Sequence, residues 1–296
     1  MIGMGTDNLI RVSSDDRGRM LPAALEASIQ EQLTHGHQPF FVVATAGTTV
    51  LGAFDPIEHI GEITQKYGLW LHIDGAWGGP VAFSDRHRHL LKGSHLGDSF
   101  TWDAHKLMGL PLSCSALLVK HRGTLLDTTG DQDNEEQYLF HHEPEYGYDL
   151  GMMSLQCGRP ADVLKLWFAW QHHGLEGYRD RIDHLYDLAH YCSEFVRHHP
   201  DLELITEPTY LNICFRYNPH HAYLPEQTLE QLNLAIRYEL MRSGLTMVNY
   251  AKVKGKVIIR LVLPNGALQQ DDLEQFFNNF LTVAAKQKLN HHQTEI

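Results

Sequence analysis

Short apolar segments alternate with helical segments over the first 120 residues, and this alternation limits the possible folds most. The apolar segments have the length of buried strands and are rich in β-branched and aromatic residues. They are PFFVVAT (39–45), LWLHID (69–74), DSFTWDA (98–104) and SCSALLVK (113–120). Helices are expected over 22–34 and about 56–67. This order predicts an α/β fold whose mainly parallel sheet is covered on both faces.

The pattern changes in the second half of the chain. A helical pattern from Pro160 to about His199 is broken at Gly174. The elements expected after it are a strand (210–217), a helix (225–244), two strands (245–251 and 256–263) and a helix (271–288). We therefore expect residues 1–174 to form part of a large domain and residues 175–296 a small α+β domain.

Composition excludes several classes of protein. The chain has 296 residues and a net charge of −12, which disfavours general binding to nucleic acid or to anionic membranes. No apolar run approaches the ~20 residues that cross a bilayer, and no secretory signal is visible. The histidine pairs lack the spacing of a zinc site, so no metal site is expected. The four cysteines are spread out, as in a reduced, cytoplasmic protein: Cys114, Cys157, Cys192 and Cys214.

Two titratable residues follow predicted strands, where ligands bind in sheets of this kind. Asp74 ends one strand, and Lys106 follows another. Pyridoxal phosphate needs such a pair, because a lysine binds its aldehyde and an acid keeps its pyridine nitrogen protonated. Gly75 and Ala76 are small enough for a flat ring to lie close to the backbone. On spacing alone, however, Asp74 could cap the next segment and Lys106 could be a solvated loop residue.

Longer strings around these residues carry a specific resemblance. They are VVATAGTTVLGAFDPI (42–57), LWLHIDGAWGGP (69–80), DAHKLMGLPLSCSALLVK (103–120) and LQCGRPADVLKLW (155–167). From Gly3 to about Lys286 the sequence resembles the group II pyridoxal-phosphate-dependent decarboxylases, in the branch for glutamate, cysteine sulfinate and aspartate. The resemblance implies a fold of the aspartate-aminotransferase type (fold type I), a homodimer with active sites at the subunit interface, and α-decarboxylation of an acidic L-amino acid.

The resemblance also implies roles for single residues at the cofactor. Lys106 matches the lysine that binds the cofactor covalently, and Asp74 matches the acid paired with the pyridine nitrogen. Ala76 matches the small residue packed against the ring. Thr48 and His105 fall at positions that line the cofactor.

Two further residues match the family at the substrate. Tyr138, in QYLF, matches a tyrosine on a mobile loop that returns a proton to the substrate carbon after carbon dioxide leaves. The acidic segment 127–149 around it is expected to be that loop. Arg260, in IIRLVLPNG, matches the arginine that binds a substrate carboxylate. The alternative for Tyr138 is an aromatic side chain that anchors a loop. The alternative for Arg260 is a strand residue that faces solvent.

Two departures from the family pattern matter. Family members often carry Asn-Pro-His-Lys where this chain has Asp103-Ala104-His105-Lys106, and an ionised Asp103 would repel a phosphate that asparagine can bind. Asp103 is therefore expected either to turn away or to orient a neighbouring residue. The family also has a long part ahead of this sequence, with a phosphate-binding loop and substrate contacts. We therefore expect the C-terminal portion of such an enzyme. The alternatives are a non-catalytic remnant and another lyase or transaminase of the same fold.

Overall fold

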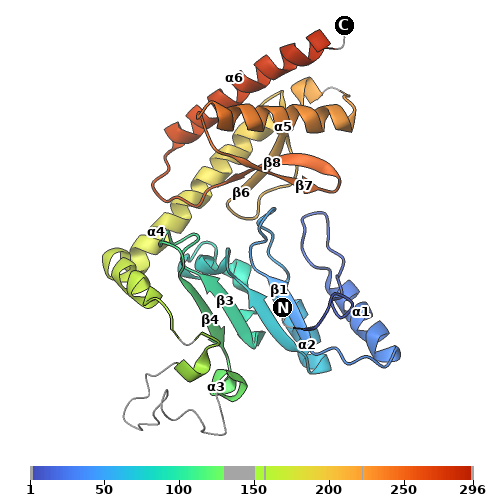
Figure 1. The fold of residues 1–296 in the computed structure, drawn as a ribbon, viewed down its shortest axis with the longest axis vertical. Coiled ribbons are helices and arrows are strands. Elements are labelled where there is room, and N and C mark those ends of the chain that lie inside the picture. Colours follow the sequence, from blue (N-terminus) through green and yellow to red (C-terminus); the bar gives the residue numbers. More distant parts are fainter. Residues whose placement is uncertain (1–2, 130–150, 157, 222, 295–296) are drawn as a thin grey trace.

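The computed structural model describes residues 3–129, 151–156, 158–221 and 223–294. In Figure 1 they form two sheets with their helices, one above the other, joined by a long helix. The strands are β1 (Phe41–Thr45), β2 (Trp70–Asp74), β3 (Ser99–Asp103), β4 (Ser115–Val119), β5 (Leu202–Leu204), β6 (Asn212–Tyr217), β7 (Asn249–Val253) and β8 (Lys256–Val262).

The helices separate and cover these strands. The α-helices are α1 (Pro22–Thr34), α2 (Ile57–Tyr67), α3 (Thr124–Thr129), α4 (Asp162–His198), α5 (Glu226–Arg242) and α6 (Gln270–Thr294). Short 3-10 helices are η1 (Gly79–Phe83), η2 (Arg88–Leu91), η3 (Ser94–Leu96), η4 (Gly151–Met153) and η5 (Pro219–His221). Gly68 ends α2 with a positive φ of 66°, which suits glycine.

The first sheet has the order β1-β2-β3-β4. Its first two pairs are parallel and the third is antiparallel, which confirms the predicted mainly parallel sheet. Thr45 lies opposite Asp74, and Asp74 lies opposite Thr101. The ends of β1, β2 and β3 therefore meet at one edge of the sheet, where the predicted cofactor residues follow them.

Only one face of this sheet is covered by the described residues, which corrects the expected coverage of both faces. Val42 and Leu71 belong to the core that includes side chains of α1 and α2. On the opposite face Phe41, Val43 and Leu117 are 44%, 42% and 51% exposed.

The crossover connections explain the open face. The strands β1, β2 and β3 lie side by side in chain order, and right-handed crossovers that advance in one direction lie on one face of a sheet. The first crossover contains α2 and the second contains η1, η2 and η3, and α2 contacts η3. Both connections therefore cover the same face.

The second sheet has the order β5-β6-β8-β7, and all of its strand pairs are antiparallel. All six residues of β6 are buried, and α5 packs on β6 and β8 and against α6. The strands β6, β7 and β8 and the helices α5 and α6 were predicted, and η5 was not. The three residues of β5 were not, because so short a segment has no hydrophobic period.

Helix α4 connects the two sheets. Gly174, inside α4, has the non-helical angles φ 63° and ψ −172°, so the helix is broken there. This break lies at the boundary that we propose between residues 1–174 and 175–296, and the boundary stays a prediction.

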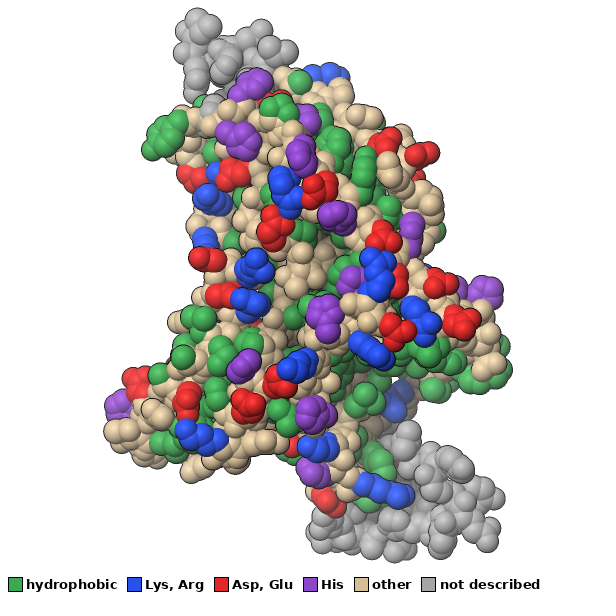
Figure 2. Space-filling model, turned by 180° about the vertical axis from the view of Figure 1, so that it is seen from behind, with side chains coloured by type: hydrophobic (Ala, Val, Ile, Leu, Met, Phe, Trp, Pro, Cys, Tyr) green, Lys and Arg blue, Asp and Glu red, His purple; other side chains and the backbone are tan. Residues whose placement is uncertain are grey.

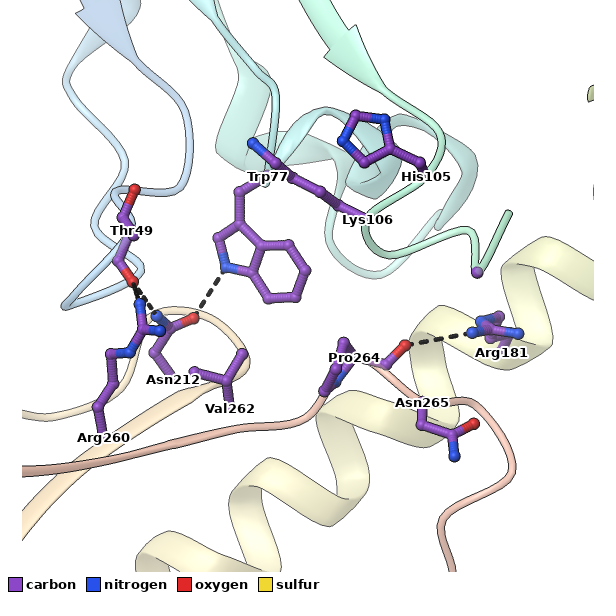
Figure 3. Close-up of a pocket in the computed structure, with 11 residues that line it drawn as sticks. Thr49, Trp77, His105, Lys106, Arg181, Asn212, Arg260, Val262, Pro264 and Asn265 are labelled. Atoms are coloured by element: carbon purple, nitrogen blue, oxygen red, sulfur yellow. Dashed lines mark hydrogen bonds between the residues drawn. The ribbon is translucent and has the colours of Figure 1, made fainter. Parts of the chain in front are cut away.

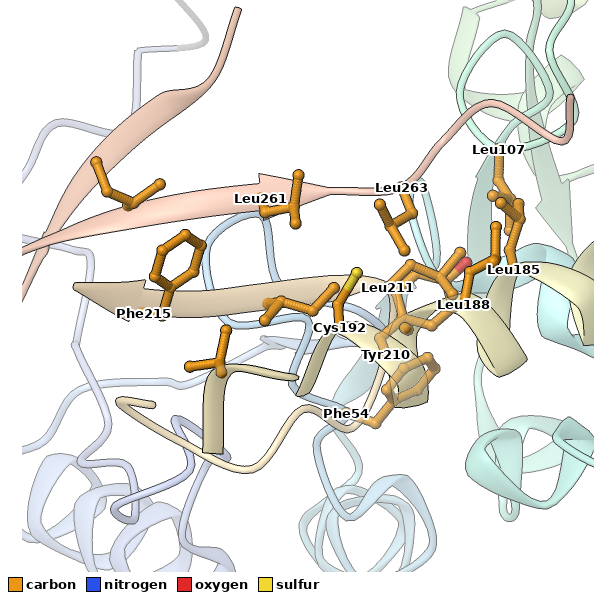
Figure 4. Close-up of a cluster of buried hydrophobic side chains, with 14 of the residues drawn as sticks. Phe54, Leu107, Leu185, Leu188, Cys192, Tyr210, Leu211, Phe215, Leu261 and Leu263 are labelled. Atoms are coloured by element: carbon orange, nitrogen blue, oxygen red, sulfur yellow. The ribbon is translucent and has the colours of Figure 1, made fainter. Parts of the chain in front are cut away.

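One hydrophobic core crosses from the first part of the chain to the second (Figure 4). Leu107 and Phe54 come from the first part and pack with Leu185 of α4 and with Tyr210 and Leu263 of the second part. All five side chains are at most 5% exposed. The two sheets are therefore held together by apolar burial close to Lys106.

Within the described ranges, no helix has both the length and the apolar character that crossing a bilayer demands. Cys114, Cys192 and Cys214 are buried and free.

Arg216 of β6 forms an ion pair network inside the second sheet. Its side chain is 6% exposed and lies 2.8 Å from Glu203 and 2.9 Å from Glu226. Burial opposes ionisation of Glu203, but hydrogen bonds from Arg216 and Asn218 outweigh it and hold the pKa of Glu203 below its usual range. A carboxylate whose pKa is lowered by folding stabilises the fold above its ordinary pKa and loses that effect as the pH falls.

We expect Arg216→Met to lower the free energy of unfolding by about 3 kcal/mol at pH 7, because it leaves a half-buried carboxylate without its partner. The wild-type protein should lose stability between about pH 5 and 3, and the variant should lose less over that window. Urea unfolding at pH 3 to 7 measures both effects. Arg242→Met, which removes an exposed pair with Glu239, should change stability by less than about 1 kcal/mol. Equal pH slopes for wild type and Arg216→Met would contradict this account.

Candidate functional site

A pocket of about 600 Å³ lies between the end of the first sheet and the second sheet (Figure 3). This volume suits a cofactor together with a small substrate. The pocket is lined by Thr49, Trp77, His105, Lys106, Gly109, Arg181, Asn212, Arg260, Val262, Pro264 and Asn265. Three of the residues predicted from the sequence are therefore brought together: His105, Lys106 and Arg260.

Lys106 is presented by the turn that follows β3. Its backbone N–H donates to the carbonyl oxygen of Asp103 at 3.1 Å, which closes the turn. Its side-chain Nζ lies 2.8 Å from Oδ2 of Asp103. The side chain of Lys106 is 40% exposed, so a ligand in the pocket can reach the amine.

His105 is fixed by the chain that returns as β4. The backbone N–H of Cys114 lies 3.1 Å from Nδ1 of His105, and the carbonyl oxygen of Cys114 lies 2.9 Å from it. Nε2 lies 3.9 Å from the Asp103 carboxylate. The imidazole of His105 is 14% exposed and is held rigidly beside Lys106.

Arg260 of β8 reaches the pocket from the second sheet. One guanidinium N–H donates to the carbonyl oxygen of Thr49, in the loop after β1. Asn212 of β6 binds the same loop, because its amide donates to Thr49 and Val50 at 3.0 Å each. Asn212 also accepts a 2.8 Å hydrogen bond from the indole of Trp77. The second sheet thus orders one wall of the pocket.

Arg181 of α4 lies at the opposite end of the pocket from Arg260 in Figure 3. It donates to the carbonyl oxygen of Leu107 at 3.1 Å and to that of Pro264 at 3.2 Å. These bonds connect the turn of Lys106 with the segment after β8. The charged run around Arg181 is typical of a solvated helix face, so this position could not be predicted from the local sequence.

Asp74 ends β2 and does not line the pocket. Its Oδ1 accepts the backbone N–H of Ala76 at 3.1 Å, and no side-chain hydrogen bond to this carboxylate occurs in the described residues. Burial lowers the pKa of the neighbouring His72, although the Asp74 charge opposes that shift. A low pKa keeps His72 neutral at pH 7, so it leaves the Asp74 charge available to a cation.

Two other predicted residues remain without a test. The hydroxyl of Thr48 accepts the backbone N–H of Ala53 at 3.0 Å and so closes a turn after β1. Its contact with a cofactor stays a prediction. Tyr138 lies outside the described residues, as does the expected loop 127–149 from residue 130 onward; its first residues, 127–129, belong to the end of α3.

The residues at this site fit pyridoxal phosphate. Lys106 supplies an accessible amine, and Asp74 has one carboxylate oxygen to which no described group donates. The pocket is also cationic, since it is lined by Lys106, Arg181 and Arg260, which suits a ligand with phosphate and carboxylate groups. The expected contacts of Asp74 and Ala76 with the ring stay predictions.

The many histidines do not gather at this pocket. Figure 2 shows histidines interspersed with acidic and basic side chains over the back of the molecule. Within the described ranges, no group of three or more histidine, cysteine, aspartate or glutamate side chains could hold a metal ion.

Known proteins match this chain in sequence and in fold. A family model described as the pyridoxal-dependent decarboxylase conserved domain matches residues 2–218. The structure of mouse CSAD is 36% identical, with a TM-score of 0.90 over 96% of this chain and 60% of that chain. The glutamate decarboxylase domain of diaminobutyrate-pyruvate transaminase and L-2,4-diaminobutyrate decarboxylase from Vibrio parahaemolyticus is 27% identical, with a TM-score of 0.80 over 96% of this chain and 55% of that chain.

A more distant match shares the fold alone. Oryza sativa TDC, solved with PLP and tryptamine, is 23% identical, with a TM-score of 0.88 over 96% of this chain and 59% of that chain. The chain therefore spans 60% or less of the length of each of these three solved relatives.

Proposed function

Because the chain belongs to the pyridoxal-dependent decarboxylase family, we propose that it removes the α-carboxyl group of an acidic L-amino acid with pyridoxal phosphate as its cofactor. The family and its fold type I architecture, both predicted from the sequence, are confirmed by the family model and the solved relatives. The acidic class of substrate goes beyond them. Its candidates are glutamate, aspartate and cysteine sulfinate.

One observation carries this proposal. Lys106 follows the first sheet and Arg260 lies in the second, yet both line the same pocket. Among the described residues that line the pocket, Lys106 alone carries an amine that can form an imine with an aldehyde. A guanidinium in the same pocket suits a carboxylate, because it can form two parallel hydrogen bonds with one.

Pyridoxal phosphate, when bound, supplies an electron sink for the bond that breaks at the substrate Cα. Lys106 would hold the cofactor through its amine and would exchange it for the amine of the substrate. The free oxygen of Asp74 would accept the N–H of the pyridine nitrogen, and Ala76 keeps that carboxylate oriented through its own N–H. In this proposal, residues at or just after the ends of strands in the first sheet hold the cofactor.

The remaining residues act on the substrate and on protons. Arg260 would bind a carboxylate of the substrate, and the carbonyl oxygen of Thr49 holds its guanidinium in place. His105 would flank the ring from a position fixed by the backbone of Cys114. We assign the return of a proton to the substrate Cα to Tyr138.

A second candidate is a protein that folds and binds the cofactor without catalysis. One observation favours it: one face of the first sheet is open among the described residues. Such a protein would still bind the cofactor at Lys106, so binding and carbon dioxide release must be measured separately.

A homodimer and a cytoplasmic location belong to the same proposal. The first part of α4 supports the homodimer, because Val163, Trp167 and Phe168 are 69%, 54% and 64% exposed there. Apolar side chains gathered in this way are typical of a surface that another subunit covers. Sedimentation of the purified chain at several concentrations measures the oligomeric state.

The test of the function has two stages. Protein mixed with pyridoxal phosphate and reduced with borohydride should carry the label on the peptide that contains Lys106. Carbon dioxide release should then be detected from at least one of glutamate, aspartate and cysteine sulfinate, and not from tryptophan. A label at Lys106 without release would favour the non-catalytic candidate. A label on another residue would refute the site.

A further inference from the structure

We propose that Asp103 is the counter-ion of Lys106 in the cofactor-free protein, and that its carboxylate controls how tightly Lys106 captures an aldehyde cofactor. This rests on the proposed function, since it takes Lys106 as the residue that binds the cofactor. It gives a role to the position at which this sequence departs from the family's Asn-Pro-His-Lys pattern.

The ion pair is built into a single turn. Asp103 is the last residue of β3 and is 9% exposed. The chain turns back after it, and the backbone hydrogen bond from Lys106 to Asp103 fixes that turn at 3.1 Å. The amine and the carboxylate of the same two residues are then 2.8 Å apart. The turn therefore brings the two side chains within reach of each other.

The carboxylate of Asp103 stays ionised at neutral pH. Burial opposes its ionisation, but hydrogen bonds with Lys106 and Ser115 outweigh burial and hold the pKa of Asp103 below its usual range. His105 adds a weaker influence, since its Nε2 lies 3.9 Å away. A largely buried negative charge needs a cation beside it, and the Lys106 ammonium supplies that cation.

Other charged groups around the amine do not replace this pair. Arg181 and Arg260 line the same pocket but donate to backbone carbonyl oxygens. Asp74 ends the neighbouring strand and forms no ion pair with Lys106. Among the described residues, Asp103 is therefore the acid that pairs with the Lys106 amine.

Capture of the cofactor requires this pair to open. The Lys106 ammonium first gives one proton to solvent. The neutral nitrogen then forms a double bond to the aldehyde carbon, and the aldehyde oxygen leaves as water with the two remaining amine hydrogens. A carboxylate that stabilises the ammonium opposes the first step, so its removal should favour capture.

The experiment compares pyridoxal phosphate with pyridoxal, which has the same aldehyde and no phosphate. Dissociation constants are measured by absorbance from pH 6 to 9, and borohydride labelling locates the adduct. We expect Asp103→Asn to bind both compounds about tenfold more tightly at neutral pH, because the ion pair no longer opposes capture. Asp103→Glu, which keeps the charge, should stay close to wild type. If Asp103→Asn does not fold, Asp103→Ser removes the same charge and should give the same result.

A matched control removes a charge at the other end of the strand. Asp98 precedes β3 and accepts the backbone N–H of Leu71 at 2.8 Å, away from Lys106. Asp98→Asn should leave both dissociation constants within about twofold of wild type. Tighter binding of pyridoxal phosphate alone in Asp103→Asn would overturn the proposal, because Asp103 would then act on the phosphate. Unchanged binding of both compounds would overturn it too. Absence of label at Lys106 in wild type would instead refute the proposed function.

Discussion

Lys106→Ala should abolish the absorbance band that pyridoxal phosphate gives on binding covalently, and with it the borohydride label. The reason is chemical, since alanine has no amine and, among the described residues, no other lysine lines the pocket. Non-covalent binding through the rest of the pocket, such as Arg181, should be weaker than wild-type binding by about a hundredfold or more. Spectrophotometric titration and peptide mass mapping measure the two effects.

Lys165→Ala is the control for this variant. Lys165 also pairs with an aspartate three residues away, at 2.6 Å from Asp162, but it lies outside the pocket. It should bind pyridoxal phosphate like the wild type. If Lys106→Ala kept the band, or if Lys165→Ala lost it, Lys106 would not be the residue that holds the cofactor.

The first sheet could be predicted because its local signals agree with its packing. Each strand is an apolar run of strand length, and Pro22 and Gly68 mark a helix start and a helix end. Its open face could not be predicted from those signals. Runs such as FFVVAT indicate burial on both sides, but where covering elements lie depends on the direction of the crossovers.

Site residues could be predicted only where the surrounding segment carries a recognisable motif. Lys106 and Arg260 were found from motifs, and the structure places both in one pocket. Asn212 and Arg181 were missed because their roles arise from contacts across the sequence, such as Asn212 with Thr49. An asparagine inside the apolar segment YLNICF was the one local signal, since a buried amide needs partners.

The ion pair between Asp103 and Lys106 shows a different limit. The sequence indicated that Asp103 would repel a phosphate, and that it would turn away or orient a neighbour, but it did not identify that neighbour. The turn after β3 places the Lys106 amine 2.8 Å from the Asp103 carboxylate. Spacing of three residues allows such a contact, but only the turn geometry decides whether the two side chains meet.

Arg260→Gln should remove the preference for acidic amino acids. The guanidinium is expected to bind a substrate carboxylate through charged hydrogen bonds, and its loss should raise the concentration of glutamate, aspartate or cysteine sulfinate that displaces Lys106 by about a hundredfold. This displacement is followed through the absorbance of the bound cofactor, so it can be measured whether or not carbon dioxide is released. Arg260→Lys should recover only part of the effect, because an ammonium cannot form two parallel bonds with a carboxylate.

A purely structural role for Arg260 would give a different result. Arg260 also donates to the carbonyl oxygen of Thr49, and the loss of that bond could disturb the loop after β1. Disturbance of the loop should weaken the binding of acidic and neutral amino acids alike, and it should also weaken the capture of pyridoxal phosphate. Recognition of a carboxylate should leave capture of pyridoxal phosphate within about threefold of wild type. Glutamine is the uncharged analogue of glutamate and lacks its side-chain carboxylate. If Arg260→Gln weakened the binding of glutamate and glutamine equally, Arg260 would not bind that carboxylate. If it changed the binding of neither, Arg260 would have no role in substrate binding.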